Sequence, residues 1–147
     1  MTIDFKGPME RALLKIEKAV VDEINSGVPP PNAPSTIKRK KSSKTLIDSG
    51  KMRQHVDHKI TGEGLNLRGS VGFFDEENAK KARINEEGAT WVKTSKGGSK
   101  GMSQEYTLIV IPPRPFLVPG FDKAAPKAAD EMAEEILAQV ERDLRRR

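Results

Sequence analysis

The sequence contains no cysteine, which excludes disulfides, thiolate metal sites and cysteine nucleophiles together. Aromatic residues make up only 5% of the chain, so stacking platforms for single-stranded nucleic acid are scarce. No run of about 18 apolar residues occurs, and the charged N-terminal segment lacks the apolar centre of a secretory signal. We therefore expect neither a membrane span nor export by that route.

Apolar residues are also few for a chain of this length. Hydrophobic residues make up 35% of the sequence, charged residues 32%, and the mean hydropathy is -0.60. A length of 147 residues predicts one domain covering residues 1–147. Long mobile segments, or a surface completed by neighbouring subunits, would explain how such a domain is stable with so little apolar material.

Two long amphipathic helices are predicted, one near each end of the chain. Apolar residues recur at three- and four-residue steps over residues 5–24, with charged residues on the opposite face. Gly27 can adopt a positive φ and three consecutive prolines follow it, so this helix must end there. A second apolar stripe covers residues 121–144 and predicts the long C-terminal helix.

The middle of the chain is predicted to form β-strands and one short helix. A hairpin is predicted from residues 56–60 and 65–73, a helix over residues 76–87, and two further strands at residues 89–92 and 106–111. Asp75 is expected to cap the short helix and Gly88 to end it, while Asp48 or Ser49 is expected to cap a turn before the first strand. The fold class is α+β, with a small antiparallel sheet flanked by the two long helices.

Two segments have the composition of loops. Residues 28–45 form a basic loop that contains at most one or two helical turns, and residues 93–104 form a flexible loop rich in lysine and glycine. The side chains that could face DNA are Lys38, Arg39, Lys40, Lys41, Lys96 and Lys100. They could neutralise phosphates without reading bases, although solvated loops remain the simpler interpretation.

The sequence shows no residue pattern typical of a catalytic site. His55 and His58 lie three residues apart, but no glutamate stands between them in a metal-binding motif, so two solvated residues on a strand are expected. Residues 97–101 are rich in glycine but lack the spacing of a phosphate-binding loop. We therefore predict no catalytic residues, no cofactor and no metal, and a protein that is not an enzyme.

The segment 111–116, Ile-Pro-Pro-Arg-Pro-Phe, is the most distinctive in the chain. Its prolines fix φ and favour extended backbone before them, so the strand must end before the helix begins. Phe116 can fill the junction between sheet and helix, and the five donors of Arg114 can bind carbonyls or a carboxylate. Pro113, Arg114, Pro115 and Phe116 are accordingly predicted either to clamp this junction locally or to contact a neighbouring subunit.

Four segments, residues 32–37, 46–53, 85–88 and 111–117, occur in an order that resembles the bacteriophage virion-morphogenesis and tail-completion proteins, a neck and minor tail protein Z-like family. The resemblance implies a structural subunit that forms a homo-oligomeric ring, a hexamer in such proteins. It also implies neck, tail and head-connector proteins as partners, and a place in the virion after assembly in the host cytoplasm. Non-specific contact with genomic DNA is a separate hypothesis that rests on the lysine clusters. The alternative is a small basic protein that binds DNA non-specifically.

Overall fold

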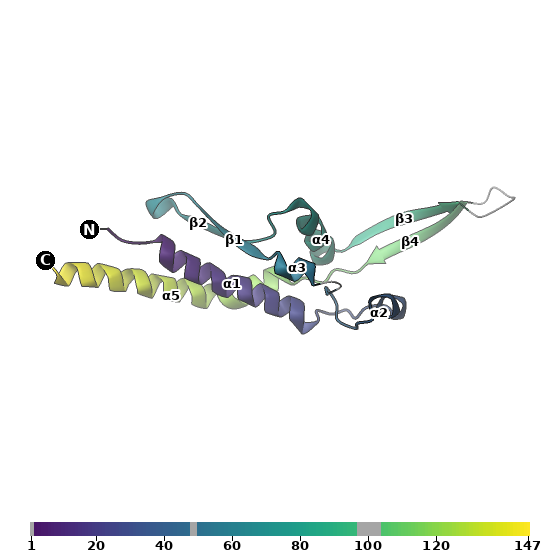
Figure 1. Cartoon of the computed structure of the whole chain (residues 1–147), viewed down its shortest axis with the longest axis horizontal. Helices are drawn as coiled ribbons and strands as arrows, with labels where there is room; N and C mark the ends of the chain where they lie inside the picture. The colour runs from purple at the N-terminus through teal and green to yellow at the C-terminus, as the bar shows by residue number, and fades with distance from the viewer. Residues whose placement is uncertain (1, 48–49, 97–103) are drawn as a thin grey trace.

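The protein was analysed as a computed structural model that describes residues 2–47, 50–96 and 104–147 (Figure 1). Its two long helices, α1 (Lys6–Ser26) and α5 (Leu117–Arg145), pack side by side and run in opposite directions. Both chain ends therefore lie at the same end of the molecule. The chain between these helices lies over one side of the pair and extends beyond its far end, opposite the chain ends (Figure 1).

The packing of α1 on α5 follows from the apolar stripe of α1. Its buried side chains include Leu13, Ile16, Val20 and Ile24, spaced three and four residues apart, so one face is directed inward. Gly120 of α5 lies against this face, where an added Cβ would stand 2.7 Å from the Cα of Val20. Only glycine permits such a close approach of the two backbones.

Polar contacts join the two helices along their length. The Nε of Arg11 donates to Glu135 over 2.9 Å, and further ion pairs join Lys15 to Glu131 and Lys123 to Glu23. Each pair joins a carboxylate to a lysine or arginine side chain that is more than half exposed, so water screens much of the attraction. They fix the register of the helices more than they stabilise the fold.

The hydrophobic core lies where the two helices meet the middle of the chain. Seven buried residues form it: Val20, Ile24, Val28, Met52, Val56, Ala82 and Phe116. Phe116 is fully buried, and its ring meets that of Phe73 edge to face, with 6.1 Å between the centroids. The core is small, as the low apolar content of the sequence implies.

The strands form two separate hairpins. β1 (Asp57–Thr61) pairs antiparallel with β2 (Arg68–Gly72), and β3 (Ala89–Lys96) pairs antiparallel with β4 (Gln104–Ile111). A short 3-10 turn, η1 (Gly64–Asn66), lies between β1 and β2. The predicted α+β class is confirmed, with the strands divided between two two-stranded sheets.

Three short helices complete the part of the fold that the structure describes: α2 (Pro34–Lys40), α3 (Lys51–Gln54) and α4 (Glu76–Glu87). The predicted basic loop 28–45 thus contains a helix of two turns, within the limit expected from its sequence. Asp75 and Gly88 bound α4 as predicted, whereas the expected cap at Asp48 or Ser49 lies outside the described residues. Within the ranges that the structure describes, every helix is too short or too polar to cross a membrane.

Both boundaries of the predicted flexible loop 93–104 were wrong. Residues 93–96 continue β3, pairing with residues 104–107 of β4, although their lysine, threonine and serine composition indicated the start of a flexible loop. Cross-strand pairing with the β-rich partner outweighs the weak local preference of these residues. Gln104, at the other end of the predicted loop, likewise belongs to β4, and residues 97–103 lie outside the described part of the chain.

Replacing Phe116 by alanine should lower the free energy of unfolding by about 3–5 kcal/mol, because it removes a fully buried ring and leaves a cavity. Leu65→Ala, at a side chain that is 86% exposed, is the control and should change stability by less than about 0.5 kcal/mol. Urea unfolding followed by circular dichroism measures both. Equal effects of the two substitutions would contradict the assigned core.

Asp75 should contribute stability that is lost in acid. Its carboxylate accepts from the backbone N–H of Asn78 over 2.9 Å, and this hydrogen bond holds its pKa below the ordinary aspartate value. A lowered folded-state pKa stabilises the protein above the unfolded-state pKa, and the contribution disappears as the pH falls below about 4. Asp75→Asn keeps a capping side chain without titrating. Compared with it, the wild type should lose more stability between about pH 5 and pH 2, and identical pH profiles would refute the assignment.

Candidate interaction surfaces

Arg114 occupies the centre of the joint between β4 and α5. Its side chain is 8% exposed and donates from Nε to the carbonyl of Pro30 over 2.7 Å and from Nη2 to the carbonyl of Pro31 over 3.2 Å. Its backbone N–H donates to the carbonyl of Asn85 over 2.6 Å. Burial lowers the pKa of the guanidinium from its ordinary value, because desolvation disfavours charge. Arg114 therefore clamps the triple-proline segment to the joint within one chain.

Glu86, at the end of α4, caps the first turn of α5. Its Oε2 accepts from the backbone N–H groups of Phe116 and Leu117 over 2.8 and 3.0 Å, and its Oε1 accepts from that of Val118 over 3.2 Å. A carboxylate is favoured there because the N-terminus of a helix carries partial positive charge and unpaired N–H donors. The sequence did not predict this role, because the capping carboxylate lies 30 residues before Phe116 and not in the residue that precedes the helix.

The four residues of the segment 113–116 that were predicted to have a structural role differ in their exposure. Arg114 and Phe116 are buried inside the joint, whereas Pro113 and Pro115 are exposed. Gly88 lies against the same segment with φ of 77°, and an added Cβ would stand 2.8 Å from the carbonyl oxygen of Ile111. The local clamp is thus the role that the observed contacts of Arg114 and Phe116 fit. Contact with a neighbouring subunit stays a prediction for the two exposed prolines.

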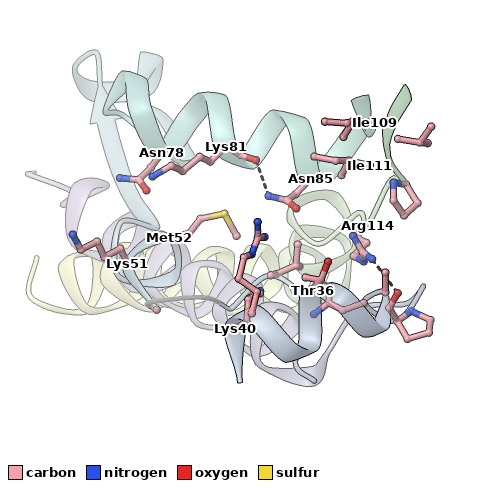
Figure 2. Close-up of a pocket in the computed structure, with 18 of the residues that line it drawn as sticks. Thr36, Lys40, Lys51, Met52, Asn78, Lys81, Asn85, Ile109, Ile111 and Arg114 are labelled. Atoms are coloured by element: carbon pink, nitrogen blue, oxygen red, sulfur yellow. Dashed lines mark hydrogen bonds between the residues drawn. The ribbon is translucent and has the colours of Figure 1, made fainter. Parts of the chain in front are cut away.

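An open pocket of about 730 Å³ lies beside this joint, between α2, α4 and the base of the β3–β4 hairpin. Figure 2 shows Thr36 and Lys40 of α2 on one side and Asn78, Lys81 and Asn85 of α4 facing them. The part of the lining that the structure describes carries five basic side chains and no acidic one: Arg39, Lys40, Lys51, Lys81 and Arg114. We call this pocket the basic groove.

The apolar part of the basic groove comes from four elements or loops. Leu46, Met52, Trp91, Ile109 and Ile111 contribute to its lining. Cations beside apolar side chains suit a ligand that is both acidic and amphipathic, because the charges orient it while apolar contact supplies affinity.

The predicted DNA-facing residues are only partly brought together. Arg39 and Lys40 line the basic groove, while Lys38 and Lys41 are exposed beside it. Lys96 stands at the end of β3 away from the groove, and its side chain lies outside what the structure describes. Lys100 lies outside the described residues altogether. The two basic segments therefore do not form one continuous face within the described chain.

The β3–β4 hairpin projects away from the body of the molecule (Figure 1). Thr90, Val92 and Thr94 of β3 pair with Val110, Leu108 and Tyr106 of β4, which places these six side chains on one face of the hairpin. The exposed fractions on this face are 57% for Val92, 64% for Leu108 and 59% for Val110. We call it the outer hairpin face. It presents apolar side chains in a row, and sequence alternation alone could have identified it.

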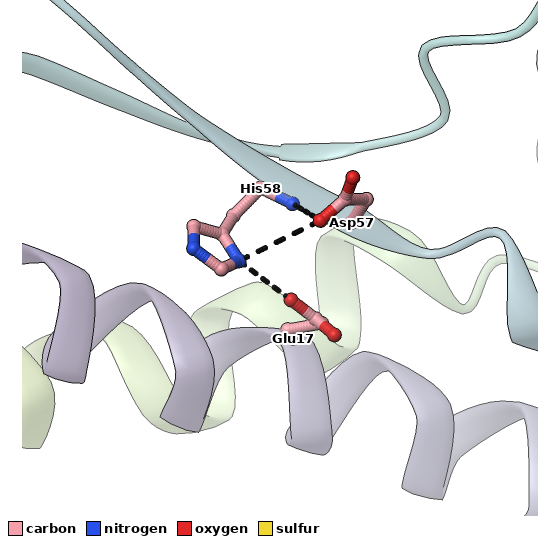
Figure 3. Close-up of side chains that lie close together, drawn as sticks. All are labelled: Glu17, Asp57 and His58. Atoms are coloured by element: carbon pink, nitrogen blue, oxygen red, sulfur yellow. Dashed lines mark hydrogen bonds and ion pairs between the residues drawn. The ribbon is translucent and has the colours of Figure 1, made fainter.

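A third cluster joins β1 to α1. The Nδ1 of His58 lies 2.7 Å from Oε2 of Glu17 and 3.8 Å from Oδ1 of Asp57 (Figure 3). In the part of the chain that the structure describes, these three residues are the one group whose metal-ligating atoms all lie within 4.8 Å of one another. The His58 side chain is 18% exposed, so the prediction of a solvated residue is wrong for it, and His55 follows α3 rather than lying on a strand. The Glu17 contact makes His58 a tether of the first hairpin.

Comparisons with models of known protein families, with curated proteins and with solved structures found no match to this chain.

Removing the carboxylate of Glu86 should destabilise the protein by about 1–2 kcal/mol, because three N–H donors of α5 lose their acceptor. Glu87→Ala is the matched control, since the neighbouring glutamate is exposed and makes only an ion pair with Arg83 within α4. Its effect should stay below about 0.5 kcal/mol. Chemical denaturation compares the two, and a Glu87→Ala effect as large as that of Glu86→Ala would count against the capping role.

Proposed function

We propose that this protein is a non-enzymatic assembly subunit of a bacteriophage neck or tail. It forms a homo-oligomeric ring that completes the tail or joins it to the DNA-filled head. The order of the four sequence segments that resemble tail-completion proteins suggests this identity. The outer hairpin face is the structural observation that favours self-association.

An isolated two-stranded hairpin is at best marginally stable in water, and both of its edges offer unpaired backbone groups to another chain. In this protein the hairpin also exposes Val92, Leu108 and Val110 side by side. Apolar side chains arranged in this way gain free energy when a second surface covers them, by about 25 cal/mol per Å² of apolar area. The small core supports the same view, because contacts between subunits would supply the burial that one chain lacks.

A ring requires a heterologous contact, in which two different surfaces of each subunit meet and the rotation closes. The elongated molecule has well-separated ends and sides, which suits such contacts (Figure 1). The proposed partners are further copies of this chain and neighbouring neck, tail and head-connector proteins. The proposed location is the virion, with assembly in the host cytoplasm.

The alternative function is non-specific DNA binding by a single chain. The observation in its favour is the basic segment on α2, where Lys38, Arg39, Lys40 and Lys41 follow one another. Binding through phosphates would weaken steeply with salt, because each neutralised phosphate releases a counterion. Within a ring, the same residues could also meet DNA as it passes, so DNA contact alone does not distinguish the two functions.

The purified full chain should form rings in solution, which light scattering coupled to size-exclusion chromatography and negative-stain imaging can detect. Val92→Lys and Leu108→Lys should each weaken this association at least tenfold, because a charge would be buried at the contact. Leu65→Lys places the same charge at another exposed leucine and should leave association unchanged.

A chain that stays monomeric at high concentration and never associates with phage particles would overturn the assembly proposal. If that monomer bound duplex DNA with a strong dependence on salt, the alternative function would take its place.

A further inference from the structure

The free surface of α5 carries a stripe that complements the basic groove. Its members are Asp130, Glu134, Leu137, Glu141 and Leu144, which follow one another at alternating steps of four and three residues. All five are exposed, and Leu137 and Leu144 are 61% and 59% exposed. This spacing places them along one face of the helix. We call it the acidic stripe.

The acidic stripe is distinct from the face of α5 that packs on α1. Glu131 and Glu135 pair with Lys15 and Arg11 of α1 and so take part in the fold. Asp130 and Glu134 make no ion pair with any residue in the described ranges, and Glu141 pairs only with Arg145 within its own helix, over 3.9 Å. The packing of α5 on α1 therefore accounts for Glu131 and Glu135. In the described chain, Asp130, Glu134 and Glu141 make no ion pair with another helix or strand.

The two complementary surfaces cannot meet within one chain. The basic groove lies between α2, α4 and the hairpin base, whereas the acidic stripe covers the C-terminal half of α5, near the opposite end of the molecule (Figure 1). We propose that the basic groove of one subunit receives the acidic stripe of a second copy of this chain. This inference rests on the proposed function and assigns two further surfaces of its heterologous contact, in addition to the outer hairpin face.

The composition of the basic groove favours a helix face over a nucleic-acid backbone. A phosphate backbone needs cations, but it gives no use to the exposed Trp91 and the half-buried Ile109 in the same lining. The acidic stripe offers carboxylates for the cations and leucines for the apolar side chains. The pocket volume of about 730 Å³ accommodates several side chains of one helix face, such as those of Glu134 and Leu137.

Charge reversal tests the pairing directly. Arg39→Glu changes the groove and Glu134→Lys changes the stripe, and each should weaken self-association of the full chain about tenfold or more. Combining both reversals in one chain should restore association, because the introduced glutamate of one subunit and the introduced lysine of the next again carry opposite charges. Sedimentation velocity at several protein concentrations measures this, and unchanged circular dichroism and melting temperature establish that each variant is folded.

Two matched controls separate the pairing from general charge effects. Lys38→Glu reverses a charge on α2 next to Arg39 but outside the groove lining, and Glu10→Lys does so at an exposed position of α1. Both should associate as the wild type does. Leu137→Ser should weaken association without changing any charge, since Leu137 supplies apolar contact.

Three results would overturn the inference. Wild-type rings that survive both single reversals would place the contact on another surface and leave the proposed function intact. Reversals that weaken association singly but show no restoration when combined would refute the pairing of these two surfaces. If Arg39→Glu abolished salt-dependent binding of duplex DNA and left assembly unchanged, the groove would be a nucleic-acid surface. A wild-type chain that is monomeric throughout would instead remove the proposed function itself.

Discussion

The fold depends on the joint between β4 and α5, where three segments far apart in sequence are fastened together. Phe116 fills the core, the carboxylate of Glu86 caps the helix that begins beside it, and Arg114 holds the carbonyls of the triple-proline segment. Each contact satisfies a group that would otherwise be costly to bury: an apolar ring, helix N–H donors and backbone carbonyls. Because α5 also forms the base on which α1 packs, this joint sets the direction of the helix pair relative to the β3–β4 hairpin.

Because this joint holds the chain together, other surfaces of the molecule remain exposed. The β3–β4 hairpin projects from the body (Figure 1). It carries an apolar outer face, the basic groove lies at its base, and the acidic stripe lies along the free side of α5. The outer hairpin face and the acidic stripe take no part in the core of the single chain. Exposed surfaces of this kind gain free energy when another chain covers them, which is the reason for proposing an assembly subunit.

The elements with a strong local cause were predicted well. The apolar stripe of α1, its end at Gly27, and the bounds of α4 at Asp75 and Gly88 all follow from helix periodicity and terminal residues. The length of β3 was not predicted, because residues 93–96 are strand only through pairing with β4. His58 was assigned to solvent because its partner Glu17 lies 41 residues earlier, on another element. The family resemblance and the phage function stay predictions.

The sequence by itself determined the α+β class, the two long helices, the break imposed by the prolines before Phe116, and the shortage of apolar residues. These depend on backbone preference and periodicity, which act over a few residues. Only the tertiary structure decided that Arg114 binds the carbonyls of Pro30 and Pro31, that Glu86 caps α5, and that cations from α2, α3 and α4 line one groove. Such contacts depend on how elements distant in sequence pack, and no local pattern encodes that distance or direction.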